Sequence, residues 1–111
     1  MIRVAFARVK PDKVERLESW LHELMNRQDE VRETFVQETV RHEQAFIIPG
    51  EKGPLLIYVM EAEDHERRRE ASASSQLPID LEHRRVMNEV LAEKLQVAPL
   101  YDCALPKSGA S

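Results

Sequence analysis

The chain has 111 residues, of which 42% are hydrophobic and 32% charged, and its formal net charge is −4. These proportions are typical of one folded domain, which we place at residues 1–105 with a disordered tail at 106–111. The negative charge argues against nucleic acid and anionic membranes as partners, because both attract basic proteins. One cysteine, Cys103, excludes an internal disulfide framework, and no apolar run approaches the ~20 residues of a membrane span. We therefore expect a cytoplasmic protein.

The first third of the chain predicts a strand followed by helix. Residues 2–9 carry apolar side chains on both alternating faces, which predicts a strand, and Lys10-Pro11 ends it. From residue 12 to about residue 38, apolar side chains recur at spacings of three and four. One continuous helix over that range would be ~40 Å long. The pattern allows either such a helix or a break near Gln28-Asp29.

The remainder predicts three strands and two helices. We place strands at 39–48, 55–62 and 97–105, a short exposed helix at 63–73 and an amphipathic helix at 79–95. The glycines and prolines at 49–54 join the first two of these strands into a hairpin. Pro99 cannot donate a ladder hydrogen bond, so the last strand should be an edge or bulged strand.

This order is β-α-β-β-α-β with an extra helix before the last strand, which is the ferredoxin-like plan of an α+β fold. That plan puts helices on one face of a four-stranded antiparallel sheet. Strands 2–9 and 55–62 are apolar on both faces, and a bare apolar face indicates an interface. We expect a homodimer packed through this sheet face, a dimeric α+β barrel. The alternative is a monomer with a solvated sheet face.

Several segments together carry a family resemblance. They are Val9-Lys10-Pro11-Asp12-Lys13, Trp20-Leu21-His22-Glu23-Leu24, Val31-Arg32-Glu33-Thr34, Glu43-Gln44-Ala45-Phe46, Leu56 to Asp64, and Pro78-Ile79-Asp80-Leu81-Glu82-His83. Over residues 3–95 the chain resembles a small uncharacterised bacterial family of about this length. Its most distinctive element is Pro-Ile-Asp-x-x-His. The resemblance implies a ferredoxin-like fold and supplies no reaction.

More distantly, Met1-Ile2-Arg3 and the segment 55–64 resemble dimeric α+β barrel proteins such as L-rhamnose mutarotase and the antibiotic biosynthesis monooxygenases. Where the mutarotase has a tyrosine and a histidine on its first helix, this chain has Leu17 and Leu21. The paired tryptophans after the third strand are also missing, because Trp20 is the only tryptophan. The resemblance therefore implies the fold and not the mutarotase activity. We interpret Trp20 as a core residue.

Three residues are the candidates for catalysis. Asp80 and His83 lie three apart near a predicted helix start, so the carboxylate can orient the imidazole for proton transfer. The structural alternative is that Asp80 caps the helix and His83 is a core histidine. Glu43 shares a strand face with Ala45 and Ile47, and partial burial there would raise its pKa and suit it to general acid or base work. A water-exposed strand position is its alternative.

Metal and cofactor sites find little support in the sequence. His42 and Glu43 are adjacent on a strand and so point to opposite faces, and no HExxH motif is present. We expect His22 and His65 to be solvated and Cys103 to be a buried structural thiol. Arg67-Arg68-Arg69 is flanked by acidic residues, which is typical of a solvated helix face. With three glycines and no phosphate loop, we expect no cofactor and no metal.

Three functions therefore compete. The first is binding of a small organic molecule by a dimer. The second is a cofactor-independent enzyme, isomerase-like or monooxygenase-like, that transfers protons through His83, Asp80 and Glu43. The third is a structural dimer that binds another protein through the helix at 63–73. Convergence of Asp80, His83 and either Glu43 or His42 on one cavity would favour the enzyme, whereas acidic groups that only cap a helix or meet water would argue against it.

Overall fold

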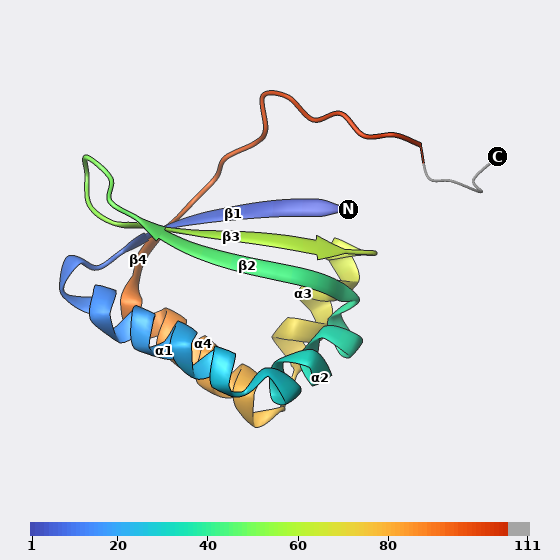
Figure 1. Cartoon of the computed structure of the whole chain (residues 1–111), viewed down its shortest axis with the longest axis horizontal. Coiled ribbons are helices and arrows are strands. Elements are labelled where there is room, and N and C mark those ends of the chain that lie inside the picture. Colours follow the sequence, from blue (N-terminus) through green and yellow to red (C-terminus); the bar gives the residue numbers. More distant parts are fainter. Residues whose placement is uncertain (107–111) are drawn as a thin grey trace.

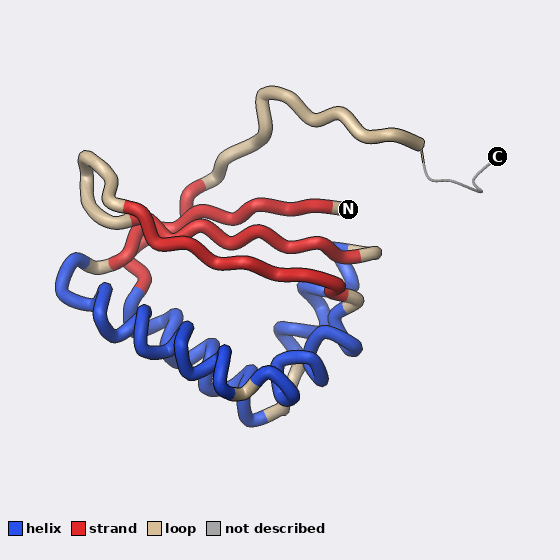
Figure 2. The backbone as a smooth tube through the Cα atoms, viewed as in Figure 1, coloured by secondary structure: helices blue, strands red, loops and turns tan. Residues whose placement is uncertain are grey.

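A computed structural model describes residues 1–106, and in them a four-stranded antiparallel sheet carries the helices on one face (Figures 1 and 2). The α+β class and the ferredoxin-like arrangement are thus as predicted. The elements are β1 (Ile2–Val9), η1 (Pro11–Lys13), α1 (Val14–Asn26), α2 (Gln28–Glu38), β2 (Val40–Ile48), β3 (Leu55–Ala62), α3 (His65–Ser74), α4 (Pro78–Val90) and β4 (Leu91–Leu95). The extra helix before the last strand is α3.

The strand order is β2-β3-β1-β4, and it leaves part of one inner strand without a neighbour. β1 pairs with β3 along nearly its whole length, from Ile2 opposite Glu61 to Arg8 opposite Leu55. β4 pairs with β1 only from Phe6 to Val9. The first half of β1, up to Ala5, therefore has a free edge on the β4 side within the described chain.

The end of the chain differs from the sequence-based prediction. Helix α4 stops at Val90 rather than at residue 95, and the last strand is Leu91–Leu95 rather than 97–105. Residues 96–106 form no strand and run as an extended arm on the side of the sheet away from the helices (Figure 1). Cys103 lies in this arm and is exposed, so the prediction of a buried thiol was wrong. Residues 107–111 of the predicted tail lie outside the described residues.

Of the two arrangements that the sequence allowed for the long helix, the structure shows the break, one residue before Gln28-Asp29. Arg27 separates α1 from α2, and its backbone N–H still bonds to the carbonyl of Leu24. Its guanidinium reaches Glu30 on α2 at 2.7 Å and Glu82 on α4 at 2.7 Å. The bend lets α1 pack against α4 while α2 packs against α3, as Figure 1 shows.

The core lies between the sheet and the pair α1 and α4. Its buried side chains come from both layers: Val9, Leu17, Trp20, Leu56, Ile79, Val86 and Val90. Trp20 is 4% exposed, so its interpretation as a core residue is confirmed. The outer sheet face has no such cover in residues 1–106, and it exposes Ile2, Val4, Phe46 and Ile48. Within residues 1–106, no helix has both the length and the apolar character needed to cross a membrane.

The substitution Trp20→Ala is expected to lower the free energy of unfolding by ~3–5 kcal/mol, because it empties a buried site and removes a hydrogen bond. Urea unfolding followed by circular dichroism would measure the change. The matched control is Val36→Ala on α2, where the side chain is 83% exposed and a change within ~0.5 kcal/mol is expected. Equal stabilities of the two variants would contradict the structural role of Trp20.

Candidate functional site

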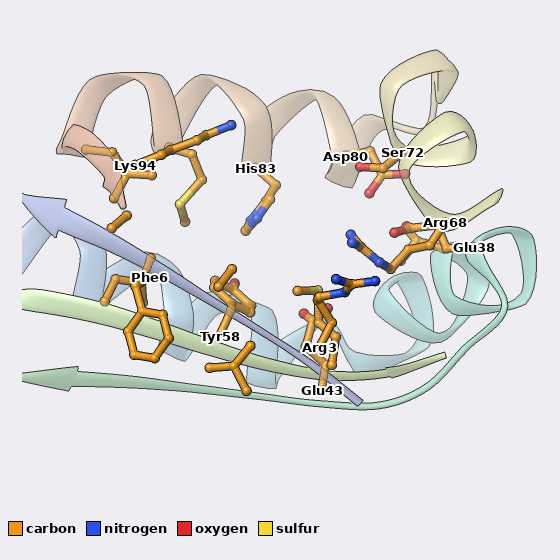
Figure 3. A pocket seen from close by; sticks show the side chains of 18 of the residues that line it. Arg3, Phe6, Glu38, Glu43, Tyr58, Arg68, Ser72, Asp80, His83 and Lys94 are labelled. Atoms are coloured by element: carbon orange, nitrogen blue, oxygen red, sulfur yellow. The ribbon is translucent and has the colours of Figure 1, made fainter. Parts of the chain in front are cut away.

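A cavity of about 510 Å³ lies between the inner face of the sheet and the helices. It brings together the three residues that the sequence singled out, since Glu43, Asp80 and His83 all line it. Figure 3 shows Arg3, Glu38, Glu43 and Arg68 gathered toward one end, while His83 and Tyr58 point toward each other from opposite walls. Apolar side chains such as Leu56 and Met87 complete the lining.

His83 is positioned by a hydrogen bond that the sequence analysis did not anticipate. The indole Nε1 of Trp20 donates to Nδ1 of His83 at 2.9 Å. An indole N–H is only a donor, so Nδ1 must be the acceptor and the neutral ring carries its proton on Nε2. Removal of the ring from water lowers the pKa of His83, and the charge of Asp80 opposes this shift. His83 is therefore a neutral N–H donor at pH 7.

Asp80 does not hold His83 as predicted. Its carboxylate accepts from the hydroxyl of Ser75 at 2.5 Å, and within residues 1–106 it makes no hydrogen bond to His83. It is also not the helix cap, because the N-cap of α4 is Leu77 and Asp80 lies in the first turn. Ser75 in turn accepts from the amide of Leu77 at 3.2 Å, which fixes the chain entering the helix. Asp80 acts on His83 through its charge alone.

Two glutamates in the cavity titrate near neutral pH. Burial raises the pKa of Glu43 to about 7, with the charge of Asp80 adding to the effect and that of Arg68 opposing it. Burial also raises the pKa of Glu38 to about 7, helped by the charges of Asp80 and Glu43. The prediction of a raised pKa for Glu43 is thus confirmed. Its role as a general acid or base stays a prediction.

Arg68 extends from α3 into the cavity, and a hydrogen bond to His65 on the same helix holds its side chain in place. Its Nε donates to Nδ1 of His65 at 3.0 Å, and the other nitrogen of His65 donates to the carbonyl of Met1 at 2.9 Å. His65 is 3% exposed, so the prediction that it is solvated was wrong. The start of α3 is fixed by Asp64, whose carboxylate accepts from two backbone amides. The hydroxyl of Thr39 at the end of α2 joins the same corner through the backbone of Asp64.

Tyr58 forms the wall opposite His83. The two rings meet edge to face, with their centroids 6.1 Å apart. Burial raises the pKa of the Tyr58 phenol, and the charge of Glu43 adds to this rise. The phenol therefore stays protonated at pH 7 and can donate a hydrogen bond into the cavity.

A second hollow, of about 1060 Å³, opens between α1, α2 and β2. It adjoins the first cavity, because the two share the lining residues Leu24, Val31, Phe35, Glu43 and Tyr58. His22 and His42 lie on its rim and are exposed. In the described part of the chain, no group of three His, Cys, Asp or Glu side chains is arranged to hold a metal ion.

Trp20, Glu38, Tyr58 and Arg68 are the members of the site that sequence reasoning did not identify. A signal for Trp20 was present, because a tryptophan on an apolar stripe needs a partner for its N–H and His83 is a buried acceptor. Glu38 and Arg68 lie in polar stretches, where nothing in the sequence separates them from solvated neighbours such as Arg67. Only the packing of α2 on α3 turns them inward.

The substitution Trp20→Phe is expected to raise the pKa of His83, because an N–H aimed at Nδ1 favours the unprotonated nitrogen. NMR titration of the histidine ring protons would measure the shift, and ¹⁵N chemical shifts should show the Nε2–H tautomer in the wild type. The ring signals of exposed His22 supply an internal reference for effects that are not specific to His83. An unchanged His83 curve would show that the indole does not set its protonation.

The substitution Glu43→Gln is expected to raise the free energy of unfolding at pH 8 and to leave it unchanged at pH 4. The pKa of Glu43 is about 7 in the folded chain against 4.5 for an exposed glutamate, so its contribution is lost as the pH rises through about 7. At ~1.4 kcal/mol per pKa unit, the gain at pH 8 approaches ~3 kcal/mol.

Urea unfolding of both proteins at the two pH values would measure this difference. Exposed Glu33 gives the control, because Glu33→Gln should have little effect at either pH. A gain for Glu43→Gln that is the same at both pH values would contradict the burial of a charge at this position.

Comparisons with known proteins agree with this fold and supply no reaction. Among solved structures, that of Rv0793 from Mycobacterium tuberculosis superposes with a TM-score of 0.51 at 18% sequence identity, covering 93% of this chain and 96% of that chain. That likeness shows the fold alone. No curated protein matches the sequence. The model of the Family of unknown function (DUF6176) matches residues 2–105, and the chain therefore belongs to that family.

Proposed function

We propose that this protein binds a small organic molecule in the cavity between its sheet and its helices. The observation that carries the proposal is one cavity, partly open to solvent, in which half-buried polar groups converge. Its volume of about 510 Å³ falls within the ~300–1,000 Å³ of small-molecule sites. A cytoplasmic location is part of the proposal and is favoured by the single cysteine.

The composition of the walls supports an organic ligand. Apolar side chains from β3 and α4, namely Leu56, Ile79 and Met87, provide a surface for a hydrocarbon skeleton. His83 and Tyr58 each offer a donor toward the interior. Such a combination of apolar walls and a few convergent polar groups orients a ligand and excludes bulk water.

The second candidate is a cofactor-independent enzyme that moves protons, isomerase-like or monooxygenase-like. It is supported by two groups with complementary states near pH 7. Glu43 is partly ionised and can accept a proton, whereas neutral His83 can donate a hydrogen bond from Nε2 to an oxygen on which negative charge develops. In this proposal Asp80 has no direct role in the transfer and supports the protonated state of His83 through its charge.

The protein-interaction alternative through α3 has weaker support. The buried residue of that helix, His65, holds half-buried Arg68, which lines the cavity. Its outer face carries charged side chains that are typical of any solvated helix.

We further propose that a second copy of the chain covers the outer face of the sheet. Ile2, Val4 and Phe46 are exposed there, and the arm at 96–106 carries further exposed apolar side chains alongside (Figure 1). Both features belong to the same side of the molecule, so one two-fold partner can bury both. Stable dimers of this kind bury ~1,600 Å² in total.

Ligand binding can be tested with a variant that fills the cavity. Ala5 lines it, and Ala5→Phe should keep the fold while abolishing thermal shifts caused by carboxylates, sugars or quinones. The matched control is Ala73→Phe, on the exposed side of α3, which should keep them. If a wild-type response persisted unchanged in Ala5→Phe, the ligand would bind elsewhere.

For the enzyme candidate, His83→Gln is the sharper variant, because the glutamine carbonyl can still accept from Trp20. Its melting should stay within ~1 kcal/mol of wild type, while the ligand response that depends on the Nε2–H donor of His83 is lost. Identical ligand responses in the wild type and in His83→Gln would show that His83 does not take part in ligand binding.

The dimer is expected to dissociate in Val4→Glu, because a carboxylate would be buried in the apolar interface. Sedimentation velocity at micromolar concentration should give ~26 kDa for the wild type and ~13 kDa for the variant, consistent with a 12.9 kDa chain. Val36→Glu, at an exposed position on α2, should stay dimeric. A wild type that sediments as a monomer would contradict this part of the proposal.

A further inference from the structure

One cation in the cavity stands apart from every other charge there. The guanidinium of Arg68 is half-buried, and its Nε is committed to His65 at 3.0 Å. Within residues 1–106 no carboxylate comes within 4.0 Å of it, although five other ion pairs form at that distance. Burial lowers the pKa of Arg68, which means that the folded chain pays to keep this charge inside.

Each element around Arg68 carries a charged side chain that lines the cavity, but none of these side chains forms an ion pair with it. Glu38 comes from α2, Glu43 from β2, Asp80 from α4 and Arg3 from β1. Arg69 is its neighbour on α3, and its charge also lowers the pKa of Arg68. Figure 3 shows Arg68 directed into the space between these side chains. The charges are therefore arranged around a gap rather than paired across it.

The charges around that gap nearly cancel at neutral pH, and none of the carboxylates is paired with Arg68. Arg3 and Arg68 are cations and Asp80 is an anion, whereas Lys94 lies at the other end of the cavity (Figure 3). The two glutamates, each with a pKa of about 7, are only half-ionised. A guanidinium with a free pair of N–H groups is also the side chain best shaped for a carboxylate, which it can bind through two parallel hydrogen bonds.

We propose that the ligand is a small organic acid, whose carboxylate binds the free N–H groups of Arg68 and whose hydrocarbon part lies along Leu56 and Met87 toward His83. This inference rests on the proposed binding function and narrows its ligand class. An inorganic anion could satisfy Arg68 alone, but the apolar walls beyond it favour an acid with a ring or chain.

Proton uptake follows from the same arrangement. A bound carboxylate places a negative charge beside Glu38 and Glu43, so both glutamates become harder to ionise. The complex then holds more protons than the free protein, and affinity must fall as the pH rises through 7. The ligand stays ionised over this range, because simple carboxylic acids titrate near pH ~4. Any pH dependence between 6 and 8 therefore belongs to the protein.

The probes are 2-naphthoate, its uncharged amide 2-naphthamide, and inorganic phosphate, with affinities measured by ligand-observed NMR and calorimetry. The wild type should bind naphthoate at least tenfold more tightly than naphthamide, and phosphate should not compete at equal concentration. Naphthoate affinity should fall severalfold from pH 6 to pH 8, while naphthamide affinity stays constant. Calorimetry in buffers of different ionisation enthalpy should show protons taken up on binding.

The variant Arg68→Gln should abolish the preference for the acid, and Arg67→Gln on the exposed side of the same helix should keep it. Glu43→Gln should retain binding and flatten its pH dependence. If Arg68→Gln failed to fold, the pH series on the wild type would still decide between acid and amide.

Three outcomes would overturn the inference in distinguishable ways. Equal affinities for the acid and the amide would show that Arg68 does not bind a carboxylate, while the proposal that the cavity binds a small molecule would stand. Phosphate competing as well as naphthoate would show a general anion site rather than one for an organic acid. If neither naphthyl compound nor phosphate bound, and no other compound shifted the melting temperature, the binding function itself would fail together with this inference.

Discussion

The hydrogen bond between Trp20 and His83 is the interaction on which the arrangement above the sheet depends. It joins α1 to α4 at the centre of their contact, where each residue would otherwise bury an unpaired nitrogen. Arg27 reinforces the same junction from the end of α1, through its ion pair with Glu82 and its position 6.0 Å from the centre of the Trp20 ring. Because the bond consumes Nδ1, it also decides which nitrogen of His83 is left for the cavity. One contact thus serves packing and site chemistry together.

Several charged side chains in the cavity lie in positions that lower the stability of the fold. Glu38, Glu43 and Arg68 are held partly out of water, and the shifted pKa values of all three show that their charged forms are disfavoured there. Neighbouring ion pairs such as Arg16 with Glu89 lie at the surface, where such pairing is easily satisfied. Perturbed groups collected in one hollow are typical of a functional site, and here all three converge on the same end.

Sequence periodicity identified the first three strands, because those patterns reflect local geometry, and it left the long helix either continuous or broken near Gln28-Asp29. It failed at the last strand. Leu91 and Leu95 continue the apolar spacing of α4, and Ala92, Glu93 and Lys94 favour helix, so the local preference points away from a strand. Pairing with the edge of β1 overrides that preference. Glu43 and His83 were found from their place on apolar faces, whereas Glu38 and Arg68 become part of the site only through tertiary packing.

One face of the sheet lines the cavity and the other is the exposed outer face, and β1 contributes side chains to both. Its inner side chains Arg3 and Ala5 line the cavity, whereas Ile2 and Val4 belong to the exposed outer face. Alternation along a strand makes this division unavoidable, since neighbouring residues point to opposite faces. The same stretch of β1 has the free edge beyond β4, so its position is fixed on one side only, by β3. The backbone that carries Arg3 and Ala5 at the cavity is therefore the same backbone that carries Ile2 and Val4 on the outer face, so a change in the position of this half-strand moves both sets of side chains together.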